Sequence, residues 1–142
     1  TFIQDNILYL FNRGNSEAAK NGVFLYQKND KSIQFVPIAL PKLNQIEATF
    51  TDAICVNDTI YFLATAENTS STYTDGEIYG SVIGKMNSKP LEIDSIWQIS
   101  DNQKFEGLTV YNNDTNEIQF LLCEDNDTEV LEADIYKVVL SK

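Results

Sequence analysis

A short apolar strand that occurs three times constrains the fold of this 142-residue chain more than any other feature. Its copies read ILYLF at 7–11, TIYFL at 59–63 and EIQFL at 117–121. Each copy follows a turn rich in Asn and Asp, at 5–6, 57–58 and 112–116. Because these residues tolerate the left-handed backbone of tight hairpins, each turn predicts a β-hairpin. Repetition at this spacing predicts a fold built from similar units.

The residues around each hairpin extend the pattern to four antiparallel strands. Before the turns we expect short strands at 1–4, 53–56 and 107–111, and after the polar loops we expect third strands at 22–27, 77–85 and 134–140. Fourth strands are expected at 32–40 and 91–100. Pro37, Pro41 and Pro90 lie in or beside these fourth strands. That position fits an edge strand, where a missing N–H is tolerated.

Four-stranded antiparallel units at this spacing are typical of a β-propeller. We therefore predict an all-β fold, a propeller fragment of about three blades. The blade-like units are expected at about 1–45, 46–101 and 102–142, the last without its fourth strand. We interpret the chain as the C-terminal half of a propeller. An open half exposes two apolar blade faces, so we expect it to pair with a missing N-terminal half or with a copy of itself.

The charge of the chain limits its partners. The formal net charge is −11 and the pI is near 4.2. Such a surface repels phosphate backbones and anionic lipid, so we expect no nucleic acid and no membrane partner. Cations and positively charged small molecules are the favoured ligands. No apolar run approaches the roughly 20 residues of a membrane helix. We expect a soluble protein and leave its compartment open between cytoplasmic and periplasmic or secreted.

The residue types present also limit the chemistry. The chain has no His, so it holds within itself no Ser-His-Asp triad and no His-ligated zinc site. Cys55 and Cys123 lie in apolar runs. We interpret them as small buried residues, with a disulfide as the alternative. A reaction in this chain would use carboxylates or a metal, and whether it is an enzyme stays open.

Propeller topology is expected to bring one set of polar residues together. The first strand of a blade starts at the end of the disc where the second strand finishes, near the central channel. First strands start at Asp52 and Glu106. Second strands end in the candidate ligand-binding residues Asn12, Arg13, Asn15, Glu67, Asn68, Glu124 and Asp125. Tyr73 is a further candidate as part of a lid, with plain turn structure as the alternative. Ionisable side chains gathered at one rim predict a binding site.

Several of these pieces carry a family resemblance. They are the acid-small pair at 52–53, NRGN at 12–15, AEN at 66–68, YTDG at 73–76, GSVIG at 80–84 and KFEGL at 104–108. Together they resemble the C-terminal half of an uncharacterised bacterial propeller family, which is similar to esterase-like and phytase-like propellers. The resemblance implies a six-bladed fold with blades before Thr1, and it implies no particular reaction. The similar phytase-like proteins bind divalent cations and phosphate esters.

Two hypotheses about function remain, and we favour the first. In the first, a small molecule or cation binds at the channel mouth, where Asp52 and Glu106 are candidate Ca²⁺ ligands. The alternative for both acids is hydrogen bonding to neighbouring blades. Arg13 either clamps an anion or neutralises Glu67 or Asp52. An extension is a metal-assisted hydrolase of an ester or phosphoester, with Glu67 as the general base. The second hypothesis is a non-catalytic scaffold or interaction propeller.

Overall fold

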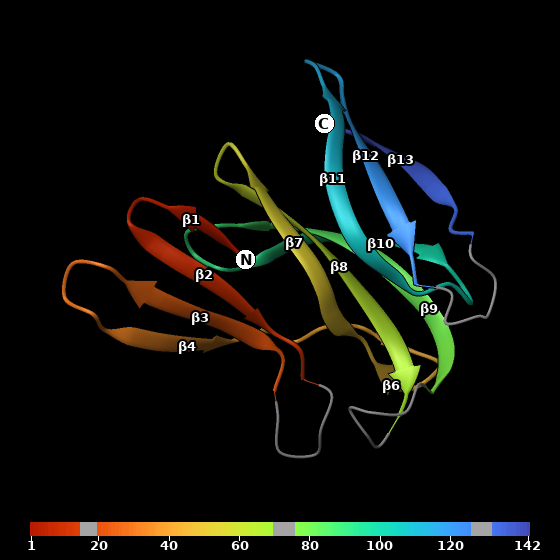
Figure 1. Cartoon of the computed structure of the whole chain (residues 1–142), viewed down its shortest axis with the longest axis horizontal. Coiled ribbons are helices and arrows are strands. Elements are labelled where there is room, and N and C mark those ends of the chain that lie inside the picture. The colour runs from red at the N-terminus through yellow and green to blue at the C-terminus, as the bar shows by residue number, and fades with distance from the viewer. Residues whose placement is uncertain (15–19, 70–75, 126–131) are drawn as a thin grey trace.

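The computed structural model describes residues 1–14, 20–69, 76–125 and 132–142 (Figure 1). Regular structure in these ranges consists of β-strands, which confirms the all-β prediction. The strands form three antiparallel sheets of three or four strands and one small hairpin. In Figure 1 the first sheet lies at the left, the second in the middle and the third at the right. The described part of the chain holds no helix with the length and apolar character needed to cross a membrane.

The first sheet is a simple meander in the order β1-β2-β3-β4. It comprises β1 (Phe2–Gln4), β2 (Ile7–Asn12), β3 (Gly22–Gln27) and β4 (Ile33–Pro37). The turn between β1 and β2 places Asp5 and Asn6 at φ of 50° and 64°, the left-handed conformation expected from their side chains. Strand β4 is an edge strand and ends at Pro37, so it is shorter than the 32–40 predicted from its apolar run.

The second sheet has the same order of strands and supplies the centre of the molecule. It comprises β7 (Thr49–Val56), β8 (Thr59–Asn68), β9 (Glu77–Asn87) and β10 (Ile93–Ser100). Asn57 and Asp58 turn the chain at φ of 48° and 64°. Strand β8 is buried from Ile60 to Ala66. It can lie this deep because both of its faces are covered by other sheets.

The third sheet has three strands among the described residues, in the order β11-β12-β13. They are β11 (Phe105–Asn113), β12 (Glu117–Glu124) and β13 (Ile135–Ser141). The segment of the chain that joins the first sheet to the second forms a hairpin of β5 (Lys42–Leu43) and β6 (Ile46–Glu47). It turns at Asn44 and Gln45, with φ of 48° and 70°. This hairpin was not predicted, because strands of two residues show no alternation in the sequence.

Two apolar cores hold the three sheets together. In the first core, Tyr9 and Val23 of the first sheet pack with Phe62 and Ala64 of the second. In the second core, Leu63 of the second sheet joins residues of the third such as Phe120 and Leu122. Successive residues of β8 therefore serve opposite cores, as the alternation of a strand requires. Strand β7 lies against β1 and β2 and also against β11, so the first strands of the sheets are neighbours.

The two cysteines correct one prediction. Both are free thiols, and Cys123 is exposed while Cys55 is half-buried. Cys123 pairs across the sheet with Gly107 and Ile135, on the face of the third sheet turned away from the second. Its apolar run placed it in a strand but carried no information about which face another sheet covers. The interpretation of Cys123 as buried was therefore wrong.

Candidate functional site

The polar residues gather at one end of the sheets, which we call the loop end. It is the end at which β2, β8 and β12 finish and at which β7 and β11 begin. Antiparallel meanders bring these points to the same end, as the sequence predicted. Four of the predicted residues, Arg13, Glu67, Glu106 and Asp125, are joined there in one chain of ion pairs.

The chain of ion pairs alternates in charge and crosses all three sheets. The guanidinium of Arg13, which follows β2, lies 2.7 Å from Glu67 Oε2 at the end of β8. It also lies 3.6 Å from Glu106 Oε1 at the start of β11. The ammonium of Lys104 continues the chain, 3.5 Å from Glu106 and 3.2 Å from Asp125. Each cation therefore stands between two carboxylates.

Among the acids in this series of ion pairs, Glu67 is the most buried, with 5% of its side chain exposed. Its second oxygen, Oε1, accepts a hydrogen bond of 2.9 Å from the Gly76 N–H. Arg13 also points its Nε at the Thr49 hydroxyl, 3.4 Å away. Arg13 thus neutralises Glu67, one of the two interpretations of this residue. Its second carboxylate partner is Glu106, where the sequence suggested Asp52.

Asp52 makes a different kind of contact, between neighbouring sheets. Its Oδ1 accepts from the N–H of Ala53 and its Oδ2 from the N–H of Leu108, each at 2.8 Å. The hydroxyl of Thr51 donates to the Phe105 carbonyl at 2.6 Å beside it. The hydrogen bonds to Leu108 and Phe105 fasten β7 to β11, which agrees with the packing interpretation of Asp52, while the bond from Ala53 lies within β7. In the described ranges no cluster of three or more His, Cys, Asp or Glu side chains suits a metal ion. A Ca²⁺ site stays a prediction.

Glu124, at the end of β12, has the uncharged partners Tyr136 and Gln103 and lies beside the ion pairs. Its Oε2 accepts from the Tyr136 hydroxyl at 2.9 Å and from the Gln103 amide at 3.4 Å. The same amide lies 2.6 Å from the Tyr136 oxygen. The hydrogen bond to Glu124 raises the pKa of Tyr136 above its ordinary value, because ionised Tyr136 would face a carboxylate.

Comparison with known families gives one match. A family of unknown function (DUF6929) matches residues 1–140. The chain belongs to the DUF6929 family. The match takes in all three sheets of the DUF6929 chain and every residue of the ion-pair chain. Neither the curated proteins nor the solved structures gave a match.

The remaining predicted site residues lie near the loop end or outside the described ranges. In the DUF6929 chain the Asn12 amide donates to the Lys20 carbonyl at 2.8 Å, which fixes the start of the loop after β2. Asn68 is exposed at the end of β8. Asn15 and Tyr73 fall outside the described residues, so the lid stays a prediction.

Sequence reasoning about the DUF6929 chain missed Lys104, Gln103 and Tyr136. Lys104 is 5% exposed, an unusual position for a lysine unless it is paired. It stands one residue before β11, next to the Phe-Glu-Gly at the strand start. That position was a usable signal, because topology places the residues flanking a first strand at the same end as its acids.

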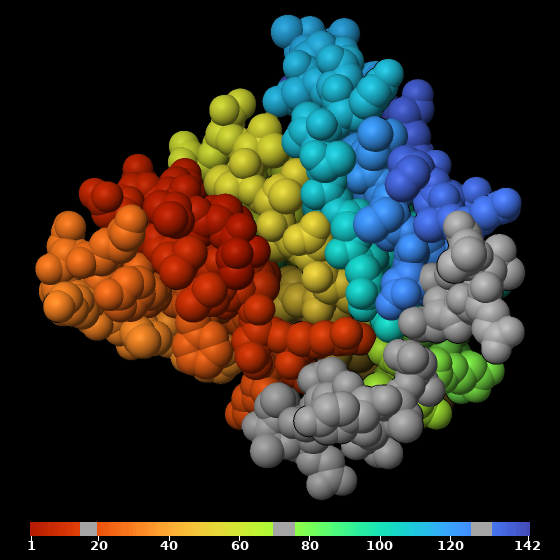
Figure 2. Space-filling model, viewed as in Figure 1, coloured from red at the N-terminus to blue at the C-terminus, as the bar shows by residue number. Residues whose placement is uncertain are grey.

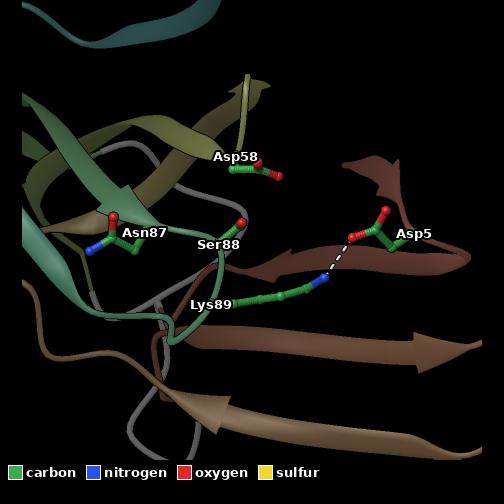
Figure 3. Close-up of a pocket in the computed structure, with 5 residues that line it drawn as sticks. All are labelled: Asp5, Asp58, Asn87, Ser88 and Lys89. Atoms are coloured by element: carbon green, nitrogen blue, oxygen red, sulfur yellow. Dashed lines mark hydrogen bonds and ion pairs between the residues drawn. The ribbon is translucent and has the colours of Figure 1, made fainter.

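A polar hollow lies at the end of the sheets opposite the loop end (Figure 3). Lys89 reaches across it to Asp5 with an Nζ–Oδ2 distance of 2.5 Å, and Asp58 accepts a hydrogen bond from Gln4. The hydrogen bond to Asp5 raises the pKa of Lys89. Lys89 and Asp5 are both exposed, and exposed ion pairs contribute little to stability. Asp5 and Asp58 also form the hairpin turns here, which accounts for their presence.

Proposed function

We propose that the three sheets are neighbouring blades of a β-propeller and that the protein is a non-catalytic binding module. Three observations support the propeller. Each sheet is an antiparallel meander, the first strands of the sheets lie against one another, and each sheet packs face to face on the next. Propellers carry their ligand sites where loops gather around the channel, so the loop end is the place to look for one.

The ligand that best fits this end is a small cation, either a metal ion such as Ca²⁺ or an organic ammonium. The observation that supports it is the excess of carboxylates in the loop-end cluster. The cluster consists of the cations Arg13 and Lys104 and the acids Asp52, Glu67, Glu106, Glu124 and Asp125. The side chains of Glu106 and Asp125 are over a third exposed, so an incoming cation meets two accessible carboxylates. Both carboxylates already lie beside cationic groups, so their position suits a positive partner. The net charge of −11 adds a favourable long-range field.

An anionic ligand, such as the phosphate esters that phytase-like propellers bind, has less support. Lys104 does add a second cation to Arg13 at this end. Each of the two, however, already stands between two carboxylates, and the acids outnumber the bases. A phosphate ester would have to displace a carboxylate from its ion pair and would be repelled by the rest of the cluster.

The hydrolase hypothesis also has less support than binding. A general base must be available to take a proton from water or substrate. Both oxygens of Glu67 already accept hydrogen bonds, one from the Arg13 guanidinium and one from the Gly76 N–H. To take a proton, Glu67 would have to give up one of these two hydrogen bonds. The binding proposal requires no such step.

The test compares thermal unfolding and titration heats in CaCl₂, in butylammonium chloride and in NaCl of the same ionic strength. A ligand at ten times its Kd stabilises the folded state by about 1.4 kcal/mol. For a domain of this size that is a rise in Tm of roughly 3–6 °C. We expect a rise in the first or the second solution, lost in a Glu106→Gln, Asp125→Asn double variant.

The control variant is Asp94→Asn, which removes one carboxylate from an exposed pair with Lys85 at the other end of the second sheet. It should keep the full ligand response, because its charge lies far from the cluster. The proposal is rejected if neither CaCl₂ nor butylammonium gives heat or a Tm rise beyond NaCl. It is equally rejected if the double variant responds as strongly as the unaltered chain.

A further inference from the structure

Two sheet faces of this molecule carry exposed apolar side chains that no described residue covers. On the first sheet, residues paired across the strands form rows that point away from the second sheet. These rows contain Ile3, Leu8, Tyr26, Ile33, Phe24 and Phe35. Ile33 is 67% exposed and Ile3 is 59% exposed. We call this the open face of the first sheet.

The third sheet has an equivalent surface, which we call its open face. Its residues alternate with those of the second core. They are Gly107, Thr109, Leu121, Cys123, Ile135 and Val139, with the polar Gln119 and Lys137 in the same cross-strand rows. Ile135 is 62% exposed and Val139 is 45% exposed. A hollow of about 450 Å³ lies here, lined in large part by these residues. Exposed apolar side chains grouped around a hollow are typical of an interaction site in a folded protein.

The two contacts already present show how such faces combine. In each contact, a sheet packs one of its faces on the adjoining face of the next sheet along the chain. At the first contact, Phe11 of the first sheet meets Phe50 of the second edge to face, with ring centroids 5.1 Å apart, and Tyr9 and Ala64 belong to the same core. At the second contact, Leu63 of the second sheet meets Leu122 of the third.

The two open faces are the unpaired halves of this same arrangement. Among the described residues, the open face of the first sheet points away from the second sheet and has no partner. The same holds for the open face of the third sheet. Figure 2 shows these sheets on opposite flanks of the second, so their open faces do not meet within one copy. Their shapes also correspond, since the first sheet presents the rings of Phe24 and Phe35, 4.7 Å apart, and the third presents Gly107, Cys123 and a hollow.

We propose that two copies of this chain associate head to tail, the open face of the first sheet of each packing on the open face of the third sheet of the other. The pairing continues the sheet-to-sheet packing within one copy, and two such contacts close a twofold dimer. Both copies carry a net charge of −11, so their association is opposed by repulsion that added salt screens. The proposal does not depend on the ligand at the loop end.

The first test is the molar mass in solution, measured by light scattering during size-exclusion chromatography. We expect about twice the 16.1 kDa of one chain, with a dimer fraction that rises with NaCl. Two variants each place a charge on one open face, Ile33→Lys on the first sheet and Val139→Lys on the third. Both positions are exposed, so the fold should persist, and circular dichroism melting verifies it. Thr115→Lys, in the exposed turn between β11 and β12, is the control and should stay dimeric.

Mixing the two variants distinguishes head-to-tail packing from other modes. Each variant alone has one altered face in both of its contacts and should be monomeric. In a mixed pair, one contact joins the two unaltered faces and the other joins the two altered ones, so a 1:1 mixture should form pairs that the single intact contact holds together. A chain that is monomeric at every salt concentration overturns the proposal and leaves a further sheet of the same kind as the occupant. An Ile33→Lys variant that dimerises by itself, or a mixture that stays monomeric, overturns the head-to-tail arrangement.

Discussion

The ion pair between Arg13 and Glu67 gives the sharpest prediction about stability. At 2.7 Å and an effective dielectric constant of about 20, the attraction between the two charges is about 6 kcal/mol. Much of this offsets the cost of removing the Glu67 carboxylate from water, since only 5% of its side chain is exposed. Breaking a fully buried pair costs about 3–5 kcal/mol. Arg13 is 32% exposed, so we expect Arg13→Met to cost about 2–3 kcal/mol.

The assay is a double-mutant cycle with Arg13→Met, Glu67→Gln and the double variant. Urea unfolding can be followed by the fluorescence of Trp97, the single tryptophan. We expect the two losses to be non-additive, with a coupling energy of about 2 kcal/mol, because the second change removes a charge that the first has left unpaired. In thermal melts Arg13→Met should lower Tm by roughly 5–12 °C.

A matched cycle on Lys85 and Asp94 serves as the control. That pair is of similar length, 3.3 Å, but both side chains are well exposed. Its coupling should be about 0–1 kcal/mol. A coupling at Arg13 and Glu67 below about 0.5 kcal/mol, or one no larger than the control, would refute the claim that the loop-end pair stabilises the packing of the sheets.

Three further predictions concern single sites. Gly84→Ala should cost about 1–3 kcal/mol in urea unfolding, because the added Cβ would lie 2.0 Å from a fully buried ring. Asp52→Ala should cost about 1–2 kcal/mol and should speed hydrogen exchange at the Leu108 amide, which loses its acceptor. The pKa of Tyr136 is raised mainly by its hydrogen bond to Glu124, so its contribution to stability is present below about pH 10 and is lost at higher pH, where the unfolded chain ionises first. Tyr136→Phe should therefore weaken the fall in stability between neutral and strongly alkaline pH, as measured by urea unfolding.

The sequence predicted those features that depend on local chemistry and on the order of the strands. The turns at Asp5-Asn6 and Asn57-Asp58 have the left-handed backbone that their side chains favour. The meeting of Arg13 and Glu67 follows from antiparallel order alone, because second strands end at one side of their sheets. The binding roles assigned to these residues stay predictions.

Other features depend on contacts that no local pattern records. Alternation places Leu122 and Cys123 on opposite faces of β12, but the sequence does not show which face another sheet covers. Lys104 was missed because a lysine beside a strand normally reaches solvent. Here it lies between two carboxylates, Glu106 in β11 and Asp125 just after β12. The arrangement of the sheets decided both outcomes.

The middle position of β8 has a consequence for how the molecule unfolds. Phe62 and Leu63 are consecutive, yet one belongs to the first core and the other to the second. A displacement of this strand loosens both cores at once, so neither flanking sheet can keep its packing after the central one is lost. The free energy that opens β8 should therefore equal that of global denaturation, and its amides should exchange last. We therefore expect the molecule to unfold as a single cooperative unit, because its two cores share one strand, although its sheets resemble separate modules.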